Sequence, residues 1–476
     1  MIYGSGMLSL SNPSTWFLFA MLTIFPAAVF ISNSVKEWSL HFLLSKHFNF
    51  RRELKNLNMR AFKAIYDEKT PDTTFMGLTP NKKKVFLLNS IKHLLACGTT
   101  GSGKTMVLLN FILSMTKNHY PGAIIDGKGD TGKGSILDTF QKLGTSRKIY
   151  VINLNDPKNS DKYNPFKNTS YTMVKDMLMN MTEWSEEHYK SNTERYLQKL
   201  AELLEKSKIE LSFADIVRCM PTDNFLKLSN ALVKREFITK QEHILNAEIA
   251  DTSGKIAQGA IARFSTIAEG ELGTIFDKSG VDISQVIEEN AIILFVLNPL
   301  SYPELSKAIG KVILIDSKKA ISRSFGNSKR KFFIMDEISS YASPALIDII
   351  NKSRSANITC ILSTQSLSDL DYAGGEFYKE QVIENCNNFI VLRQNSAVNA
   401  EKWANIIGTR QSLDMTYQIG YNKHGLAEDT GLGSGRASRE YLYHPDYIKS
   451  LEVGKGIYVT KDDNMHTRIN INNLFS

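Results

Sequence analysis

The sequence predicts an α/β fold in which helices flank a mostly parallel sheet, with an all-α insertion and an N-terminal transmembrane helix. Seven short apolar runs alternate with helical stretches, as is typical of strands buried on both faces of a parallel sheet. No strand-like run occurs in residues 171–250, and residues 1–35 contain no charged side chain. The seven runs are His93–Cys97, Ala123–Asp126, Ile149–Leu154, Ala291–Leu297, Phe332–Asp336, Ile358–Ser363 and Phe389–Leu392.

Composition places the chain among ordinary globular proteins. Its 476 residues are 42% hydrophobic and 22% charged, which excludes a disordered chain and a disulfide scaffold. The length predicts about three structural units. Four scattered cysteines lack metal-ligand spacing, which argues against a zinc site and favours a reducing compartment.

The N-terminal region has the features of a membrane anchor. Trp16–Ile31 is an apolar run whose only clearly polar residue is Thr23, and it is just long enough to span a bilayer. Seven basic and two acidic residues follow in Lys36–Lys63, which by the positive-inside rule places the rest in the cytoplasm. A buried hairpin or an interfacial helix is the alternative. We expect an anchor at 1–35 and a juxtamembrane region at 36–84.

The basic cluster also explains most of the net charge. Of the formal charge of +8, the stretch Lys36–Lys63 carries +5, which leaves only +3 for the other residues. Net charge alone therefore gives little evidence for a nucleic-acid partner.

A glycine-rich loop is the strongest chemical signal. It follows the first apolar run and opens a helical stretch, which is the context that a phosphate-binding loop requires. Glycines let backbone N–H groups turn toward a phosphate, and the helix N-terminus favours negative charge. Lys104 is expected to reach the phosphates and Thr105 to ligate Mg²⁺, so ATP and Mg²⁺ are the predicted cofactors; a structural turn is the alternative. The loop reads Gly98-Thr99-Thr100-Gly101-Ser102-Gly103-Lys104-Thr105.

An acidic pair ends another apolar run. Asp336 and Glu337 follow Phe332–Met335, where Asp336 is placed to hold Mg²⁺ and Glu337 to polarise an attacking water. Acidic residues at the N-terminus of a helix are the alternative explanation.

Two further residues are weaker catalytic candidates. Gln365 ends the strand-like run Ile358–Ser363 and could contact the γ-phosphate or its water. Arg354 lies eleven residues earlier and could stabilise transition-state charge as an arginine finger. Ordinary loop chemistry and a solvated surface arginine are the respective alternatives.

The helical insertion divides the predicted nucleotide-binding domain into residues 85–170 and 251–476. Within 171–250, the stretch Asn192–Ile209 has leucines at helical spacing, and Ser212 and Thr222 are expected to cap the next two helices.

The order of the motifs resembles the type IV coupling proteins, the membrane-anchored TraG/TraD-type ATPases of conjugation, which are related to FtsK/HerA-type DNA translocases. The resemblance covers roughly residues 85–465, including Gly431–Gly435 and the segment at His444-Pro445-Asp446. The motifs are Gly98–Thr105, Asp126-Gly127-Lys128-Gly129-Asp130, Tyr163-Asn164-Pro165-Phe166, Asp336-Glu337 and Ser363-Thr364-Gln365-Ser366.

The resemblance implies a RecA/FtsK-like P-loop ATPase that forms a homo-hexameric ring with DNA through its centre. Arg354 would then reach the nucleotide of a neighbouring subunit. The implied activity is delivery of DNA with its bound relaxase to a type IV secretion channel at the bacterial inner membrane, with the insertion selecting the substrate. The chain departs from the family pattern in having one N-terminal apolar run rather than two, and Gly127 where proline is commoner.

Other functions stay open at this point. The same motor could export proteins or move other DNA, since residues 64–476 carry only +3. An ATP-gated docking receptor with little turnover is a different class, and Glu337 argues against it because binding alone needs no base. The residues do not indicate whether DNA is single- or double-stranded.

Overall fold

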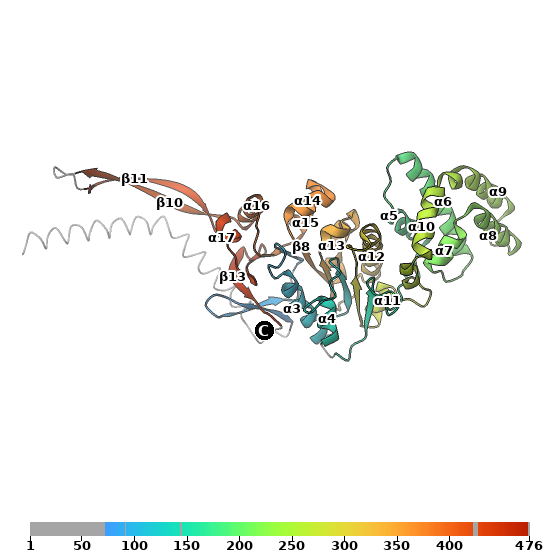
Figure 1. Cartoon of the computed structure of the whole chain (residues 1–476), viewed down its shortest axis with the longest axis horizontal. Helices are drawn as coiled ribbons and strands as arrows, with labels where there is room; N and C mark the ends of the chain where they lie inside the picture. The colour runs from blue at the N-terminus through green and yellow to red at the C-terminus, as the bar shows by residue number, and fades with distance from the viewer. Residues whose placement is uncertain (1–71, 91, 143–144, 422–426, 475–476) are drawn as a thin grey trace, which may run out of the picture. The chain divides into compact units, whose positions relative to one another are not determined.

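The computed structural model describes residues 72–90, 92–142, 145–421 and 427–474 (Figure 1). The predicted anchor at 1–35, and the juxtamembrane region as far as residue 71, lie outside these residues. Within the described ranges, no helix combines the length and the apolar character that crossing a bilayer requires.

An eleven-stranded sheet organises the molecule, and its strand order is β2-β1-β13-β12-β9-β3-β8-β7-β4-β6-β5. The seven strands from β9 to β5 in this order run parallel. They coincide with the seven predicted apolar runs, so the α/β fold with a mostly parallel sheet is confirmed. The strands are β1 (Thr73–Leu78), β2 (Lys84–Leu88), β3 (Leu94–Cys97), β4 (Gly122–Asp126), β5 (Ile149–Asn153), β6 (Ile292–Val296), β7 (Lys331–Asp336), β8 (Ile358–Thr364), β9 (Asn388–Val391), β12 (Lys455–Thr460) and β13 (Met465–Ile471).

Four antiparallel strands, β1, β2, β12 and β13, extend one side of this sheet. The sequence did not predict them. β1 and β2 alternate buried with more exposed residues, so they lack the continuous apolar run that identifies a strand buried on both faces. A separate antiparallel pair, β10 (Thr409–Tyr421) and β11 (Ala427–Tyr441), forms a second sheet.

Helices cover both faces of the parallel strands. Along β3, Leu94 and Ala96 belong to one buried cluster with α3 and α4, whereas Leu95 and Cys97 belong to a larger cluster with α11, α12 and α13. The helices outside the helical insertion are α3 (Lys104–Lys117), α4 (Ile136–Lys142), α11 (Ile283–Glu288), α12 (Pro303–Arg323), α13 (Pro344–Lys352), α14 (Leu367–Gly374), α15 (Glu376–Asn385), α16 (Ala397–Ile407) and α17 (Pro445–Lys449), with the short helices η3 (Ile338–Tyr341) and η4 (Ser353–Ala356).

A continuous run of helices lies between β5 and β6 and extends past residue 250. Ser212 caps α7 through a capping box with Asp215, as the sequence predicts. Thr222 is the first residue of α8 rather than its cap, because Pro221 occupies the capping position. These helices are α5 (Tyr171–Asn180), α6 (Glu187–Lys206), α7 (Phe213–Cys219), α8 (Thr222–Lys234), α9 (Lys240–Ile249), η1 (Ala250–Gly254), α10 (Gln258–Glu269) and η2 (Glu271–Ile275).

The chain enters and leaves this helical insertion through two adjacent segments. Tyr163 forms a parallel bridge with Val281, and its N–H donates to the Ile275 carbonyl at 2.9 Å. Gly280 lies so close that a Cβ there would meet the Tyr163 backbone at 2.5 Å. The two connections are therefore tied together at the base of the insertion.

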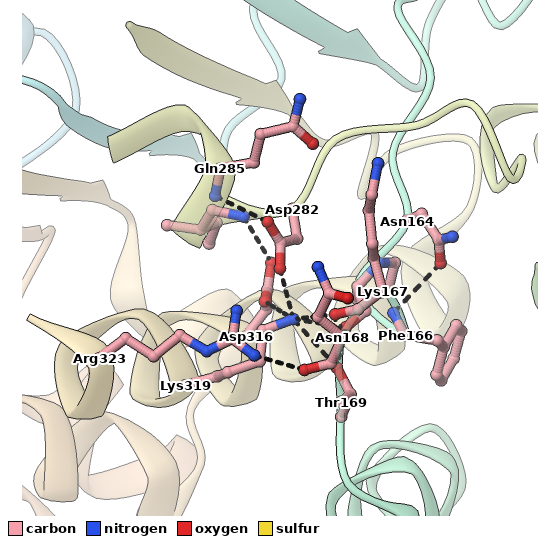
Figure 2. A network of polar contacts seen from close by, with 12 residues as sticks. Asn164, Phe166, Lys167, Asn168, Thr169, Asp282, Gln285, Asp316, Lys319 and Arg323 are labelled. Carbon is pink, nitrogen blue, oxygen red and sulfur yellow. Dashed lines mark hydrogen bonds and ion pairs between the residues drawn. The ribbon is translucent and has the colours of Figure 1, made fainter. Parts of the chain in front are cut away.

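A buried lysine on α12 fixes the same junction (Figure 2). Lys319 Nζ lies 2.8 Å from Asp282 Oδ2 and 2.9 Å from Asp316 Oδ1. It also donates to the carbonyls of Pro165 and Lys167, both at 3.0 Å. All three ionisable side chains are buried, so the charge of each is balanced by the others rather than by water. The Tyr-Asn-Pro-Phe motif thus contacts the cluster of Lys319, Asp282 and Asp316, which we call the ionic clamp.

Candidate nucleotide-binding site

The glycine-rich loop connects the end of β3 to the start of α3, as its sequence context predicts. Gly101 and Gly103 have φ values of 74° and 109°, which side chains with a Cβ adopt at a cost. At Gly98, a Cβ would meet Leu392 Cβ and Ser102 Oγ, both at 2.5 Å. The glycines are therefore required by the shape of the loop.

Neighbouring strands hold the loop in place. The Thr99 N–H donates to the Arg393 carbonyl at 2.9 Å, and the Gly454 N–H donates to the Ser102 carbonyl at 3.0 Å. Arg393 follows β9 and Gly454 precedes β12, so contacts from the end of a parallel strand and the start of an antiparallel strand shape the loop. These two contacts could not be predicted from the local motif.

Polar groups in the loop remain available to a ligand. The hydroxyls of Thr99 and Ser102 are buried without a hydrogen-bond partner among the described residues. Lys104 Nζ donates to the carbonyls of Gly98 at 2.5 Å and Thr99 at 3.4 Å, and Thr105 is half-buried in the first turn of α3. The first turn of α3 contains no acidic residue, so its N-terminus favours an anion. The loop fits a phosphate group.

Asp336 and Glu337 lie at the carboxyl end of β7. Asp336 Oδ1 accepts hydrogen bonds from Ser363 Oγ and from the Glu337 N–H, and Glu337 Oε1 accepts from Ser339 Oγ at 2.8 Å. Burial raises the pKa of Glu337, while Ser339, Lys104 and Gln365 act to lower it. A half-buried carboxylate in this environment is suited to accept a proton.

Gln365 follows β8 and meets the phosphate loop. Its Oε1 accepts a hydrogen bond from Thr100 Oγ1 at 3.1 Å, and its carbonyl accepts from the Cys97 thiol at 3.7 Å. Its side chain thus contacts the phosphate loop, and it also acts on the pKa of Glu337. The structure brings Lys104, Glu337 and Gln365 together at the carboxyl ends of the parallel strands β3, β7 and β8.

Asp126 is an acidic residue of this site that the sequence interpretation did not assign. It lies beside Asp336 in the register of β4 and β7. Its Oδ1 accepts from the N–H groups of Lys128 and Gly129, both at 3.0 Å. Burial, and then the Asp336 carboxylate, raise the pKa of Asp126 to about 7. An aspartate at the end of an apolar run was the available signal, but only the strand order shows its neighbour.

Arg354 lies apart from the other candidates. It is exposed in η4, which precedes β8, whereas Gln365 follows the same strand. The seven residues of β8 correspond to about 20 Å. Arg354 therefore lies at the amino ends of the parallel strands, whereas the phosphate loop of the same chain lies at their carboxyl ends. It does not contribute to that site.

The fold and the site define the class of P-loop nucleotide-binding proteins: a phosphate loop between strand and helix, with acidic and amide side chains at neighbouring strand ends. Within that class, residues 88–472 match the family described as the type IV secretion-system coupling protein DNA-binding domain. The chain belongs to this family. The family expected from the order of the motifs is confirmed.

Several solved structures share this fold. An unbound form of the bacterial conjugative coupling protein TrwB is 17% identical, with a TM-score of 0.60 over 86% of this chain and 90% of that chain. TrwB in complex with ADP and Mg²⁺ is 16% identical, with a TM-score of 0.59 over 86% and 91%. VirB4 of Thermoanaerobacter pseudethanolicus is 12% identical, with a TM-score of 0.56 over 85% and 98%.

A shorter relative comes from Mycoplasma pneumoniae. This uncharacterised protein is 34% identical over 104 residues, which is 22% of this chain and 69% of the relative.

Proposed function

We propose that this protein is a conjugative coupling ATPase, which binds and hydrolyses ATP to move DNA toward a type IV secretion channel. The observation that carries the proposal is the convergence of Lys104, Glu337 and Gln365 on one sheet edge in a member of the coupling-protein family. The relative TrwB binds ADP with Mg²⁺, which supports the same ligands here.

Each residue of the site has a separate role in the proposed hydrolysis. Loop N–H groups and Lys104 bind the phosphates, and Thr105 and Asp336 would hold Mg²⁺, which neutralises phosphate charge when bound. Glu337 orients the attacking water and accepts its proton. Gln365 contacts both the loop and this region, so it responds to the state of the γ-phosphate.

The wider assembly is part of the same proposal. A homo-hexamer would place Arg354 of one subunit at the nucleotide of the next, and DNA with its relaxase is the proposed cargo. We assign the chain to the bacterial inner membrane as a single-pass protein anchored by residues 1–35, with most of the chain in the cytoplasm. The DNA-binding domain named in the family description supports the DNA partner.

ATP hydrolysis by the full-length chain in mild detergent tests the proposal. Turnover is measured without DNA and with single- or double-stranded DNA, at low and moderate salt. We expect stimulation by DNA that weakens steeply with salt, because phosphate contacts release counterions.

A lysine pair provides the matched controls. Lys104→Ala should abolish turnover, whereas Lys117→Ala, at the exposed end of the same helix, should not affect it. Retained turnover in Lys104→Ala would remove the central claim. Turnover indifferent to all DNA would favour protein export, and tight ATP binding without turnover would favour a docking receptor.

A further inference from the structure

Ser363 is a buried polar residue at the end of a hydrophobic strand. It follows Ile361 and Leu362 in β8, and its side chain is 0% exposed. A hydroxyl in such a position costs free energy unless it is hydrogen-bonded. The partners of this hydroxyl therefore indicate what the serine does.

Strand order places Ser363 between the phosphate loop and the acidic pair. β8 lies between β3 and β7 in the sheet. On one side Ser363 pairs with Ala96, two residues before the loop begins. On the other side Leu362 pairs with Met335, so that Ser363 is level with Asp336. The serine thus lies at the carboxyl ends of the three strands that carry the site.

One hydroxyl joins both acidic residues. Ser363 Oγ donates a hydrogen bond to Asp336 Oδ1, because an ionised carboxylate can only accept. The same oxygen accepts from the Glu337 N–H at 3.2 Å, and this N–H also donates to Asp336 Oδ1 at 3.0 Å. The three groups form a closed network, in which Ser363 contacts the side chain of one acid and the backbone of the other.

The network leaves the second oxygen of Asp336 for a ligand. Both hydrogen bonds are made to Oδ1, and among the described residues none is made to Oδ2. Hydrogen bonds that orient a carboxylate in this way tune its affinity for a metal ion. Ser363 therefore helps to fix which oxygen of Asp336 is available.

We propose that Ser363 is a positioning residue for both acids of the site. It orients Asp336 so that Oδ2 stays available to Mg²⁺, and it holds the Glu337 backbone in its left-handed conformation, with φ 49°. The inference rests on the proposed function and deepens it, because it assigns the alignment of the two acids to one buried hydroxyl that acts through them.

Binding of Mn²⁺ to the full-length chain with ADP tests this role. Free Mn²⁺ is measured by electron paramagnetic resonance in mild detergent, and the affinity for ADP is measured separately in EDTA. Ser363→Ala should raise the Kd for Mn²⁺ about tenfold. It should leave ADP affinity in EDTA unchanged, because the phosphates bind at the loop. In ATP hydrolysis, kcat should fall about tenfold or more with little change in KM.

Two further serine variants separate positioning from packing. Ser363→Thr keeps the hydroxyl and should bind Mn²⁺ as the wild type does. Ser317→Ala removes an equally buried hydroxyl on α12, where it donates to the Ile313 carbonyl at 2.8 Å, and should not change Mn²⁺ affinity. Urea unfolding checks that each variant is folded.

The results decide on Ser363 independently of turnover. Unchanged Mn²⁺ affinity in Ser363→Ala would overturn the inference. An equal loss of affinity in Ser363→Thr would overturn it too, because packing rather than the hydroxyl would then explain the effect. The metal measurement needs no hydrolysis, so a chain that binds Mn²⁺ and ADP without turnover contradicts the proposed function only.

Discussion

Glu337 adopts a left-handed backbone conformation, with φ 49° and ψ 55°. Residues with a Cβ adopt this region at a cost, and such residues cluster at functional sites. Hydrogen bonds from the Glu337 N–H to Asp336 Oδ1 and to Ser363 Oγ, at 3.0 and 3.2 Å, hold it there. The strained backbone directs the carboxylate toward Lys104 and Gln365 rather than into a regular helix.

Replacing Glu337 separates binding from turnover. Glu337→Gln keeps an oxygen that can accept from Ser339 but removes the base, so kcat should fall by about 10²–10⁴. Affinity for a fluorescent ATP analogue should change little, because the phosphates bind at the loop. Glu384→Gln, at an exposed acid on α15, is the control. Turnover within twofold of wild type would show that Glu337 is not the base.

His93 precedes β3 and is held neutral by its surroundings. Its Nδ1 accepts from the Cys360 N–H at 3.0 Å, and its Nε2 lies 3.3 Å from Ser353 Oγ. Burial, with a smaller contribution from Arg354, lowers the pKa of His93 to about 4. The unfolded state therefore binds this proton near the ordinary pKa of 6.5, whereas the folded state does not.

The stability contributed by neutral His93 should consequently be present above pH 6.5 and be lost as the pH falls toward 4. We expect roughly 3 kcal/mol of this pH dependence, measured by urea unfolding of wild type against His93→Asn, which retains an acceptor for Cys360. Parallel pH profiles for the two proteins would contradict the assignment. His119→Asn, at an exposed histidine, controls for general pH effects.

At the scale of elements, the length of each apolar run in the sequence decided which strands could be predicted. The parallel strands are continuous apolar runs, so all seven were found. Of the four antiparallel strands that were missed, β1, β2 and β13 interrupt the apolar pattern with exposed residues. β12 is buried over five of its six residues, but only three consecutive residues, Ile457–Val459, are apolar. The pairing of these strands also depends on residues far away in the chain. Gly77 in β1, for example, pairs with Ile471.

The residues of the candidate site could be predicted from the sequence only where they belong to a local motif. The loop, Asp336, Glu337 and Gln365 belong to local motifs, and each is recognisable within a few residues. Asp126 and Ser363 become site residues only through strand order, because β4, β7 and β8 are neighbours in the sheet but distant in sequence. Arg354 could be placed only once the direction of β8 was known, because that direction puts it at the amino end of the strand, away from the phosphate loop.

The ionic clamp at the base of the helical insertion should be sensitive to loss of its cation. Lys319→Met leaves Asp282 and Asp316 buried without their partner, so the free energy of unfolding should fall by about 3–5 kcal/mol. Lys318→Met, at a partly exposed lysine paired with Asp348, should cost less than about 1 kcal/mol. Urea unfolding measures both variants.

Neutralising the carboxylates distinguishes charge from packing. Adding Asp282→Asn and Asp316→Asn to Lys319→Met should recover much of the lost stability, because no unpaired charge then remains buried. If the triple variant were as unstable as Lys319→Met, lost packing rather than unpaired charge would explain the effect.

At the scale of the whole molecule, the position of Arg354 provides a test of the proposed ring. About 20 Å of strand separates it from the nucleotide edge of its own chain, so it can act as a finger only on another subunit. In the proposed ring, head-to-tail contacts would bring the amino ends of the strands of one subunit to the carboxyl ends of the strands of the next. This geometry predicts complementation between subunits that are inactive by themselves.

Lys104→Ala and Arg354→Ala should each lose most turnover when pure, for different reasons. In a random one-to-one mixture, about a quarter of ring boundaries would pair an intact phosphate loop with an intact arginine from the next subunit. The mixture should therefore regain turnover that neither variant shows alone, measured as ATP hydrolysis at fixed total protein. Lys352→Ala, in which an exposed lysine close to Arg354 is removed, should behave as wild type. A mixture no more active than its components would place Arg354 outside catalysis, because the fold leaves it no route to the nucleotide of its own chain.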